Sequence, residues 1–132
     1  MTVLLDKETN MPPYLIMPWF LLEMELNNLQ RLVYMLLLNR LRLSMKNPRF
    51  QDEEGRPFVL YPIPSLARDT KKSPTTIKGI LNKLEAQDLI VRRRQGRGYP
   101  NRIYIKVKAY PQKRKAQPTW GYDYHAEPWE SL

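Results

Sequence analysis

The stretch SPTTIKGILNKLEAQ, residues 73–87, predicts a helix with two unlike faces. Ser73 is a good N-cap because its hydroxyl can accept from a free amide of the first turn, and Pro74 suits the first helical position because it has no N–H to satisfy. The apolar positions recur at the spacing of one helical face: Ile77, Ile80, Leu81 and Leu84. The other face is polar, cationic and short-chained: Thr75, Thr76, Lys78, Gly79, Asn82 and Lys83. One face packs and the other is offered to a partner.

A shorter helix is predicted directly before this one. Residues 65–70 (SLARDT) make about two helical turns, with Leu66 and Ala67 pointing inward. Lys71 and Lys72 then form a tight turn. A short helix, a turn and a longer amphipathic helix have the layout of a helix-turn-helix.

Two strands are predicted after the longer helix. Residues 89–91 are apolar and mostly β-branched, and residues 103–108 (IYIKVK) alternate apolar and polar side chains. Between them, residues 92–102 (RRRQGRGYPNR) combine arginines with Gly96 and Gly98, which let the chain turn and bring the backbone close to a ligand. Two strands with such a tip form a β-wing.

The longest helix is predicted over residues 27–44. Asn27 and Gln30 have the spacing of a capping box, and Asn47 and Pro48 stop the helix. Apolar positions extend well around the cylinder: Leu29, Leu32, Val33, Tyr34, Met35, Leu36, Leu37, Leu38 and Leu41. The helix is therefore covered on more than one side, either by its own domain alone or partly by a second subunit.

Residues 14–22 (YLIMPWFLL) form a dense apolar stretch that Pro18 interrupts. It predicts a short strand followed by a turn or short helix. Trp19 and Phe20 are expected in the core, the alternative being a subunit interface.

A small hairpin is predicted over residues 49–61, with an acidic turn at 52–55 (DEEG). Pro57 limits its second arm to a sheet edge or a strand start, and Pro62 and Pro64 then break the chain. Together the elements predict an α+β fold: a winged helix-turn-helix with a long central helix, a small hairpin and a C-terminal β-wing. The folded domain spans 14–108, with a flexible lead at 1–13 and a linker or flexible tail at 109–132.

Composition excludes several classes of protein. The 132 residues contain no cysteine and a single histidine, so disulfides, thiolate metal sites and histidine clusters are excluded and no metal or other cofactor is expected. No apolar run is long enough to span a membrane, and the N-terminus lacks the layout of a signal peptide. We expect a cytoplasmic protein that does not contact a membrane.

The positive charge lies in one third of the chain. Residues 64–108 carry 12 basic and 3 acidic side chains, whereas residues 1–63 and 109–132 are each balanced. Clustered cations favour a polyanion because binding releases the counterions condensed on phosphates. The alternative is a basic face that serves only solubility.

This segment holds the residues expected to bind double-stranded DNA. Helix residues would approach bases or phosphates in the major groove, and wing arginines would hold the backbone or the minor groove. The predicted set is Lys71, Lys72, Ser73, Thr75, Thr76, Lys78, Asn82, Lys83, Arg93, Arg94, Arg97 and Arg102. Gln95 and Asn101 are instead expected to cap the wing turn.

Four blocks resemble the DNA-binding N-terminal domain of the RepA_N family of plasmid replication initiators. They are YLIMP (14–18), LVYMLLLNRLRLSMKN (32–47), DEEGRPFVLY (52–61) and RQGRGYPNRIY (94–104), in family order. The resemblance implies a homodimer that binds origin repeats and contacts host replication proteins through a region beyond residues 1–132.

Other functions fit parts of the sequence. A transcriptional repressor with the same fold, or a replisome interaction module that tethers DNA nonspecifically, would share these residues. The aromatic tail (Trp120, Tyr122, Tyr124 and Trp129) could dock on the same subunit, a partner or a further domain. A strand-nicking enzyme using Tyr122 or Tyr124 beside Asp123 and His125 is disfavoured, because one histidine cannot make a metal cluster. We expect a binding protein and not an enzyme.

Overall fold

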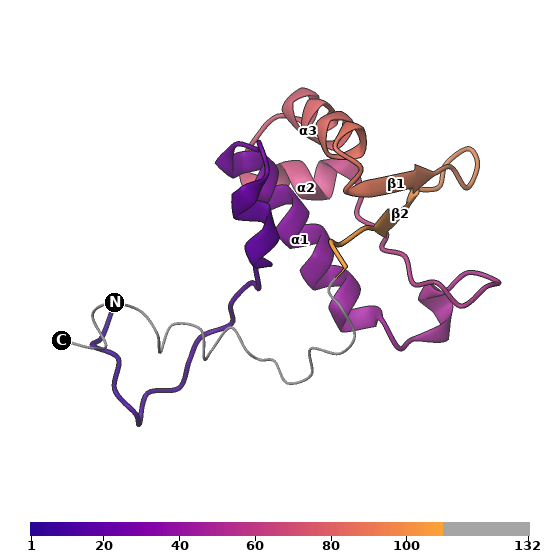
Figure 1. Ribbon diagram of the computed structural model, residues 1–132. Helices are drawn as coiled ribbons and strands as arrows, with labels where there is room; N and C mark the ends of the chain where they lie inside the picture. Colours follow the sequence, from indigo (N-terminus) through magenta and orange to yellow (C-terminus); the bar gives the residue numbers. More distant parts are fainter. Residues whose placement is uncertain (110–132) are drawn as a thin grey trace.

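The computed structural model describes residues 1–109. Within this part, three α-helices and a two-stranded antiparallel sheet form an α+β fold, as predicted. The helices lie together and the sheet projects from one side of them (Figure 1). None of the helices in this part is long and apolar enough to cross a membrane. The aromatic tail, with the tyrosines and histidine weighed for strand nicking, lies outside the described residues.

Helix α1 (Asn28–Ser44) begins and ends where the sequence predicts. The Asn27 side chain accepts from the Gln30 amide at 2.8 Å, and the Gln30 side chain accepts from the Asn27 amide at 2.9 Å, which completes the capping box. Its most buried side chains are Val33, Tyr34, Leu37 and Leu41. α1 is thus the centre of the core.

Helices α2 (Ile63–Thr70) and α3 (Pro74–Ala86) are joined by a tight turn. Lys71 adopts the left-handed conformation (φ 60°), and the Lys72 amide donates to the Ala67 carbonyl at 3.0 Å. The predicted inner faces are buried: Leu66, Ala67, Ile77, Ile80, Leu81 and Leu84. The expectation that Pro64 breaks the chain is wrong. Pro64 lies in the first turn of α2, where no backbone N–H is required.

Strands β1 (Ile90–Arg93) and β2 (Arg102–Ile105), with the tip at 94–101, form the structure we call the ribbon. Ile90 pairs with Ile105 and Arg93 with Arg102. The second strand is shorter than predicted: the paired register ends at Ile90 and Ile105, and just beyond it the Lys106 amide donates to the Leu89 carbonyl at 2.8 Å. After it, the Tyr34 hydroxyl donates to the Lys106 carbonyl at 2.8 Å, and burial raises the pKa of Tyr34 to about 12. The ribbon base is thereby fastened to α1.

No strand forms at residues 14–18, contrary to the prediction. The Asn39 side-chain amide accepts from the Ile16 amide at 3.1 Å and donates to the Ile16 carbonyl at 3.0 Å, so a side chain of α1 replaces the strand partner. A 3₁₀ helix, η1 (Trp19–Glu23), follows Pro18. Phe20 is buried against Tyr34, but Trp19 is 63% exposed, so the core prediction was correct for Phe20 and wrong for Trp19.

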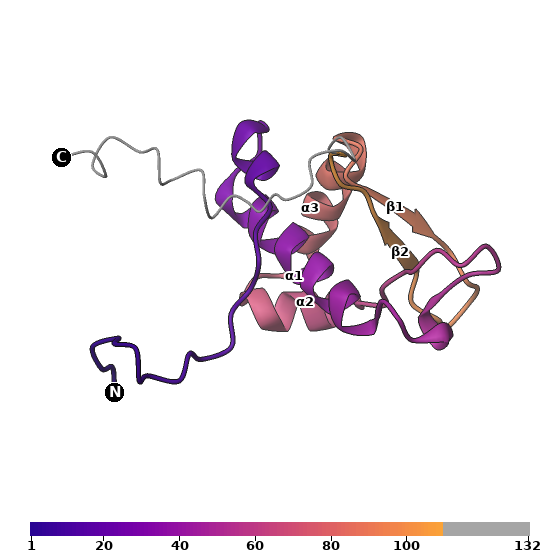
Figure 2. The same ribbon diagram turned by 60° about the horizontal axis from the view of Figure 1, so that its bottom comes forward.

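The predicted hairpin is reduced to an irregular loop. A 3₁₀ helix, η2 (Pro48–Phe50), replaces its first arm, and one bridge joins Gln51 to Pro57. Pro57 has no N–H and cannot extend the ladder. Val59 instead exchanges two hydrogen bonds of 2.9 Å with Ile103 of β2, which places the loop beside the ribbon (Figure 2).

Candidate nucleic-acid interface

The outward face of α3 is exposed and lined with lysines. Its five predicted DNA-contacting residues are all exposed: Thr75, Thr76, Lys78, Asn82 and Lys83. A Cβ atom added at Gly79 would have no heavy atom within 4 Å, so this face is also open to close approach. Lys71 and Lys72 are exposed in the preceding turn. Among residues 1–109, none of these four lysines forms an ion pair.

Ser73 has a structural position in this face. Its hydroxyl accepts from the Thr76 amide at 3.1 Å and shares a 3.0 Å hydrogen bond with the Thr76 hydroxyl. These contacts close the first turn of α3. The predicted N-cap is confirmed. The hydroxyls of Ser73 and Thr76 are hydrogen-bonded to each other at the N-terminal end of α3, the helix predicted to contact DNA.

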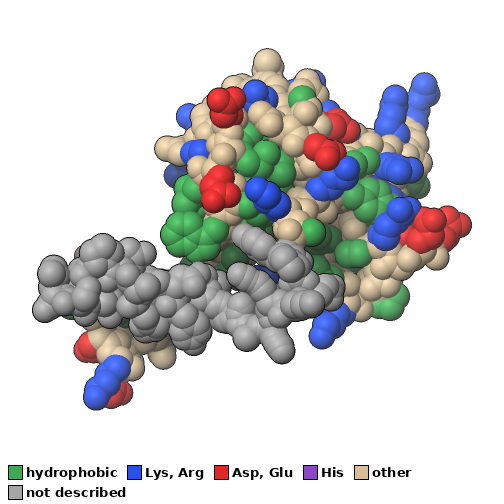
Figure 3. Space-filling model, in the orientation of Figure 1, with side chains coloured by type: hydrophobic (Ala, Val, Ile, Leu, Met, Phe, Trp, Pro, Cys, Tyr) green, Lys and Arg blue, Asp and Glu red, His purple; other side chains and the backbone are tan. Residues whose placement is uncertain are grey.

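Two arginines of the ribbon tip are exposed and make no polar contact with the described part of the chain. Arg94 and Arg97 are exposed, and neither side chain makes a hydrogen bond or ion pair within the described part of the chain. Gly98 has φ 85°, a conformation that side chains rarely adopt, so the tip can turn there. Figure 3 shows Lys and Arg side chains gathered around the ribbon at the right of the molecule, beside a group of acidic side chains.

The other predicted wing arginines contact neighbouring side chains. The Arg102 guanidinium lies 4.3 Å from the centre of the Phe58 ring, and its Nε donates to Gln95 at 3.0 Å. Gln95 in turn donates to the Pro100 carbonyl at 2.9 Å, so its expected capping role is confirmed. Arg93 lies 5.9 Å from the centre of the Tyr104 ring.

Sequence reasoning missed Arg92. From β1 this side chain turns back to α3, where its guanidinium donates to Glu85 Oε1 at 2.7 and 3.0 Å and to Asn82 Oδ1 at 2.7 Å. The hydrogen bond from Arg92 lowers the pKa of Glu85 below its usual value. The period of a strand puts neighbouring arginines on opposite faces, which is the signal that separates Arg92 from Arg93. The contacts hold the ribbon base against α3, so the helix face and the ribbon are neighbours (Figure 1).

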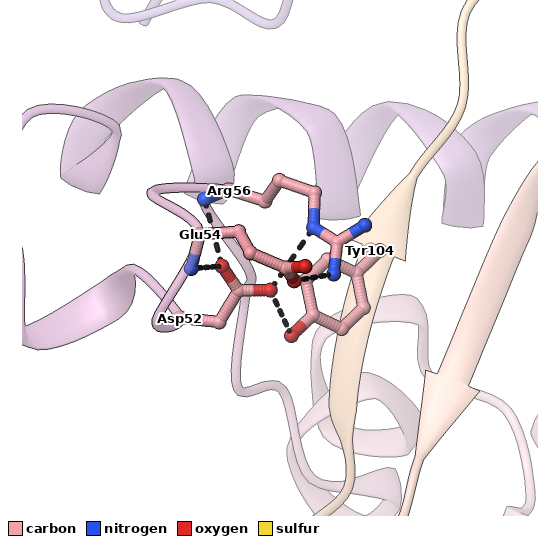
Figure 4. Close-up of polar contacts among 4 residues, drawn as sticks. All are labelled: Asp52, Glu54, Arg56 and Tyr104. Carbon is pink, nitrogen blue, oxygen red and sulfur yellow. Dashed lines mark hydrogen bonds and ion pairs between the residues drawn. The ribbon is translucent and has the colours of Figure 1, made fainter.

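The acidic turn, residues 52–56, was also missed as a support of the ribbon (Figure 4). The Asp52 carboxylate, 8% exposed, accepts from the amides of Glu54 and Arg56 at 2.9 Å each, and Arg56 also pairs with Glu54. Asp52 Oδ2 accepts from the Tyr104 hydroxyl of β2 at 3.0 Å and from Arg56 Nε at 3.1 Å. Burial alone would raise the pKa of Asp52, but these hydrogen bonds together lower it to about 2.

A hollow of about 370 Å³ lies between this turn and the ribbon. Acidic and basic side chains line it together: Asp52, Glu53, Glu54, Arg56, Arg93, Arg94, Gln95, Arg102 and Tyr104. Within residues 1–109, no group of three or more His, Cys, Asp or Glu side chains could hold a metal ion.

One family model and several solved structures are similar to this chain. Residues 13–117 match the family described as "Replication initiator protein A (RepA) N-terminus". A solved structure described as "N-Terminal domain of DNA binding protein" is 27% identical, with TM-score 0.56, over 67% of this chain and 66% of that one. "Structure of MDR initiator" is 30% identical, with TM-score 0.54, over 67% and 68%. "Structure of Rep-DNA complex" is similar in fold, with TM-score 0.63 and 22% identity, over 81% and 92%. No curated protein matches the chain.

Proposed function

The chain belongs to the family of replication initiator protein A N-terminal domains, and from this premise we propose that it binds repeated duplex DNA sites in a plasmid replication origin. The observation that carries the proposal is the exposed face of α3, whose lysines have no acidic partner in the described residues and lie next to an arginine-bearing ribbon. Such a surface gains affinity by neutralising phosphates.

In this proposal the domain is a winged helix-turn-helix. Helix α2, the left-handed turn at Lys71 and helix α3 form the helix-turn-helix, and the ribbon is the wing. α3 would lie in the major groove, and the ribbon tip would follow the backbone or the minor groove. The similar structures described as a DNA-binding protein and an initiator support the part of this proposal that concerns DNA binding.

The contacts divide the predicted residues by role. Thr75, Thr76, Lys78, Asn82 and Lys83 would reach bases or flanking phosphates, each base contact contributing about 1 to 3 kcal/mol of discrimination. Arg94 and Arg97, which have no partner in the described structure, would bind phosphate directly. Arg93 and Arg102 lie over Tyr104 and Phe58 and would chiefly shape the ribbon.

We further propose a homodimer that acts by binding and not by catalysis, in the cytoplasm where a plasmid replicates. A two-fold symmetric dimer reads two half-sites whose centres lie one helical turn of DNA, or a multiple of it, apart. The exposed apolar side chains near η1 offer a surface for a second copy: Leu15, Ile16, Trp19 and Leu22. Host replication proteins would be contacted by a region beyond this chain.

Footprinting on plasmid DNA tests the proposal. The full chain should protect repeats within the origin, and sedimentation with an origin fragment should give two chains per site. A scrambled duplex of equal length should bind at least tenfold more weakly. Protection of a promoter alone would indicate a repressor and not an initiator. Equal affinity for both duplexes would indicate that the protein only tethers DNA nonspecifically.

A further inference from the structure

The amide of Asn82 is held in one orientation by Arg92. The Arg92 side chain, which is 21% exposed, places its guanidinium Nη2 at 2.7 Å from both Asn82 Oδ1 and Glu85 Oε1. The Arg92 backbone amide also donates to Glu85 Oε2 at 3.3 Å. Glu85 thus binds both the guanidinium and the backbone amide of Arg92, and the guanidinium also contacts Asn82.

Chemistry settles which end of the Asn82 amide faces Arg92. A guanidinium has only N–H donors, so the atom that meets it has to be an oxygen. The oxygen and nitrogen of an asparagine side chain can otherwise exchange places by a flip. Because Arg92 accepts no hydrogen bond, it holds Oδ1 inward and turns the NH₂ group away from the ribbon.

The NH₂ group then lies on the exposed face of α3. Asn82 follows Lys78 by four residues and therefore shares its side of the helix. Among residues 1–109, Asn82 Nδ2 donates no hydrogen bond, although Oδ1 is occupied. The side chain presents a donor without a matched acceptor toward the surface proposed to meet DNA.

We infer that Arg92 is a positioning residue which makes Asn82 a hydrogen-bond donor toward an acceptor on DNA. The inference rests on the proposed function and adds to it the kind of base edge that Asn82 can recognise. Asparagine reads adenine by accepting from N6 and donating to N7 together. Arg92 occupies one of the two lone pairs of Asn82 Oδ1 and turns this oxygen inward, so the NH₂ group leads and suits an edge that only accepts, such as guanine N7 and O6 or thymine O4. A phosphate oxygen is the other source of the same chemistry.

A charge-neutral double variant isolates this role. Glu85→Gln with Arg92→Met removes one negative and one positive charge. The net charge, and with it the electrostatic attraction to DNA, is therefore unchanged, while the hydrogen bond that orients Asn82 is lost. Lys106→Met with Asp88→Asn is the matched control, because it removes an exposed ion pair of 2.7 Å in which Asn82 takes no part. Both variants and the wild-type full chain are used to select duplexes from a library with a randomised window, and the dissociation constants of the selected duplexes are then measured.

The double variant should lose base preference at one position and bind the wild-type duplex roughly 3- to 10-fold more weakly, with an unchanged salt slope. Adding Asn82→Ala to it should cause no further loss, and the control should match wild type. A loss that is equal for all sequences, and is also seen with Asn82→Ala alone, would identify the acceptor as phosphate. Unchanged preference and affinity in the double variant would overturn the inference.

A second variant covers a failure of the double variant to fold. Asn82→Asp keeps an oxygen toward Arg92 but has no N–H, so it should fold and lose the same base preference. If Asn82→Asp keeps both the base preference and the affinity of wild type, the donor role of Asn82 is wrong. If wild type itself binds no duplex, the proposed function fails together with the inference. Wild-type binding with unaltered preference and unaltered affinity in every Arg92 and Asn82 variant removes only the inference.

Discussion

Helix α3 and the neighbouring ribbon both carry exposed cations, but the two elements position their cationic side chains differently. The lysines of α3 have no ion pair in the described residues, and the helix is anchored by an opposite face that is fully apolar. On the ribbon, three consecutive arginines have three different positions. Arg92 binds α3, Arg93 lies near Tyr104, and Arg94 is exposed without a hydrogen bond in the described structure.

The comparison separates two ways of presenting charge. On α3 a single helical period assigns each side chain to the core or to the surface, so anchoring and binding use different residues. On the ribbon the same residue type does both, and its tertiary partner decides which. The cations of α3 should therefore all be separable from stability by mutation, whereas those of the ribbon should divide into arginines that affect stability and arginines that do not.

The largest effect is expected on the buried face of α3. Leu84→Ala removes a fully buried side chain and should lower the free energy of unfolding by about 2 to 5 kcal/mol. Lys78→Ala, on the opposite face, should change it by less than about 0.5 kcal/mol. Urea unfolding followed by circular dichroism measures both. Similar losses for the two variants would remove the division of α3 into two faces.

A smaller effect on the free energy of unfolding should distinguish the ribbon arginines that contact other residues from those that are exposed. Arg102→Ala loses the contact over Phe58 and the hydrogen bond to Gln95, and should lower the free energy of unfolding by about 1 to 2 kcal/mol. Arg97→Ala, at the exposed tip, should leave it within about 0.5 kcal/mol. If the same urea experiment finds the two variants equally stable, the ribbon arginines do not differ as the contacts indicate.

The sequence predicted α3 and α1 well because their signals are local. The Asn27–Gln30 capping box and the cap at Ser73 each join residues three positions apart, and the apolar period predicted the buried side of α3 without tertiary information. The strand predicted at residues 14–18 does not form, because Ile16 is bound by the Asn39 side chain, 23 residues away, and no local pattern indicates that contact. The inward position of Arg92 and the support of Tyr104 by Asp52, 52 residues apart, likewise depend on the folded chain. The sequence could therefore identify the cationic residues of the site, but it could not show which of them contact other residues of the domain and which are left exposed.

The acidic turn supplies a pH-dependent test of the ribbon. Hydrogen bonds lower the pKa of Asp52 from 3.8 to about 2, so its contribution to stability is present above about pH 4 and is lost as the pH falls toward about 2. Asp52→Asn should be less stable than wild type at pH 7 and should lose less stability over that acidic range. Thermal unfolding between pH 2 and pH 7 measures both.

Glu53 provides the control for this experiment. It is a neighbouring exposed carboxylate, and its side chain makes no hydrogen bond in the described structure. Glu53→Gln should therefore retain the acid-induced loss seen in wild type. An identical pH profile for Asp52→Asn and wild type would mean that Asp52 does not hold the ribbon.

The salt dependence of DNA binding tests the central claim most directly, namely that α3 and the ribbon tip form one phosphate-binding surface. Fluorescence anisotropy with an origin duplex would give the slope of log K against log salt for wild type, Lys78→Ala, Arg97→Ala and the double variant. Each lost phosphate contact should reduce the steepness of the slope by about 0.9, so the double variant should lose about 1.8, whereas Lys7→Ala in the N-terminal lead should lose nothing. An unchanged slope in the double variant would contradict the account.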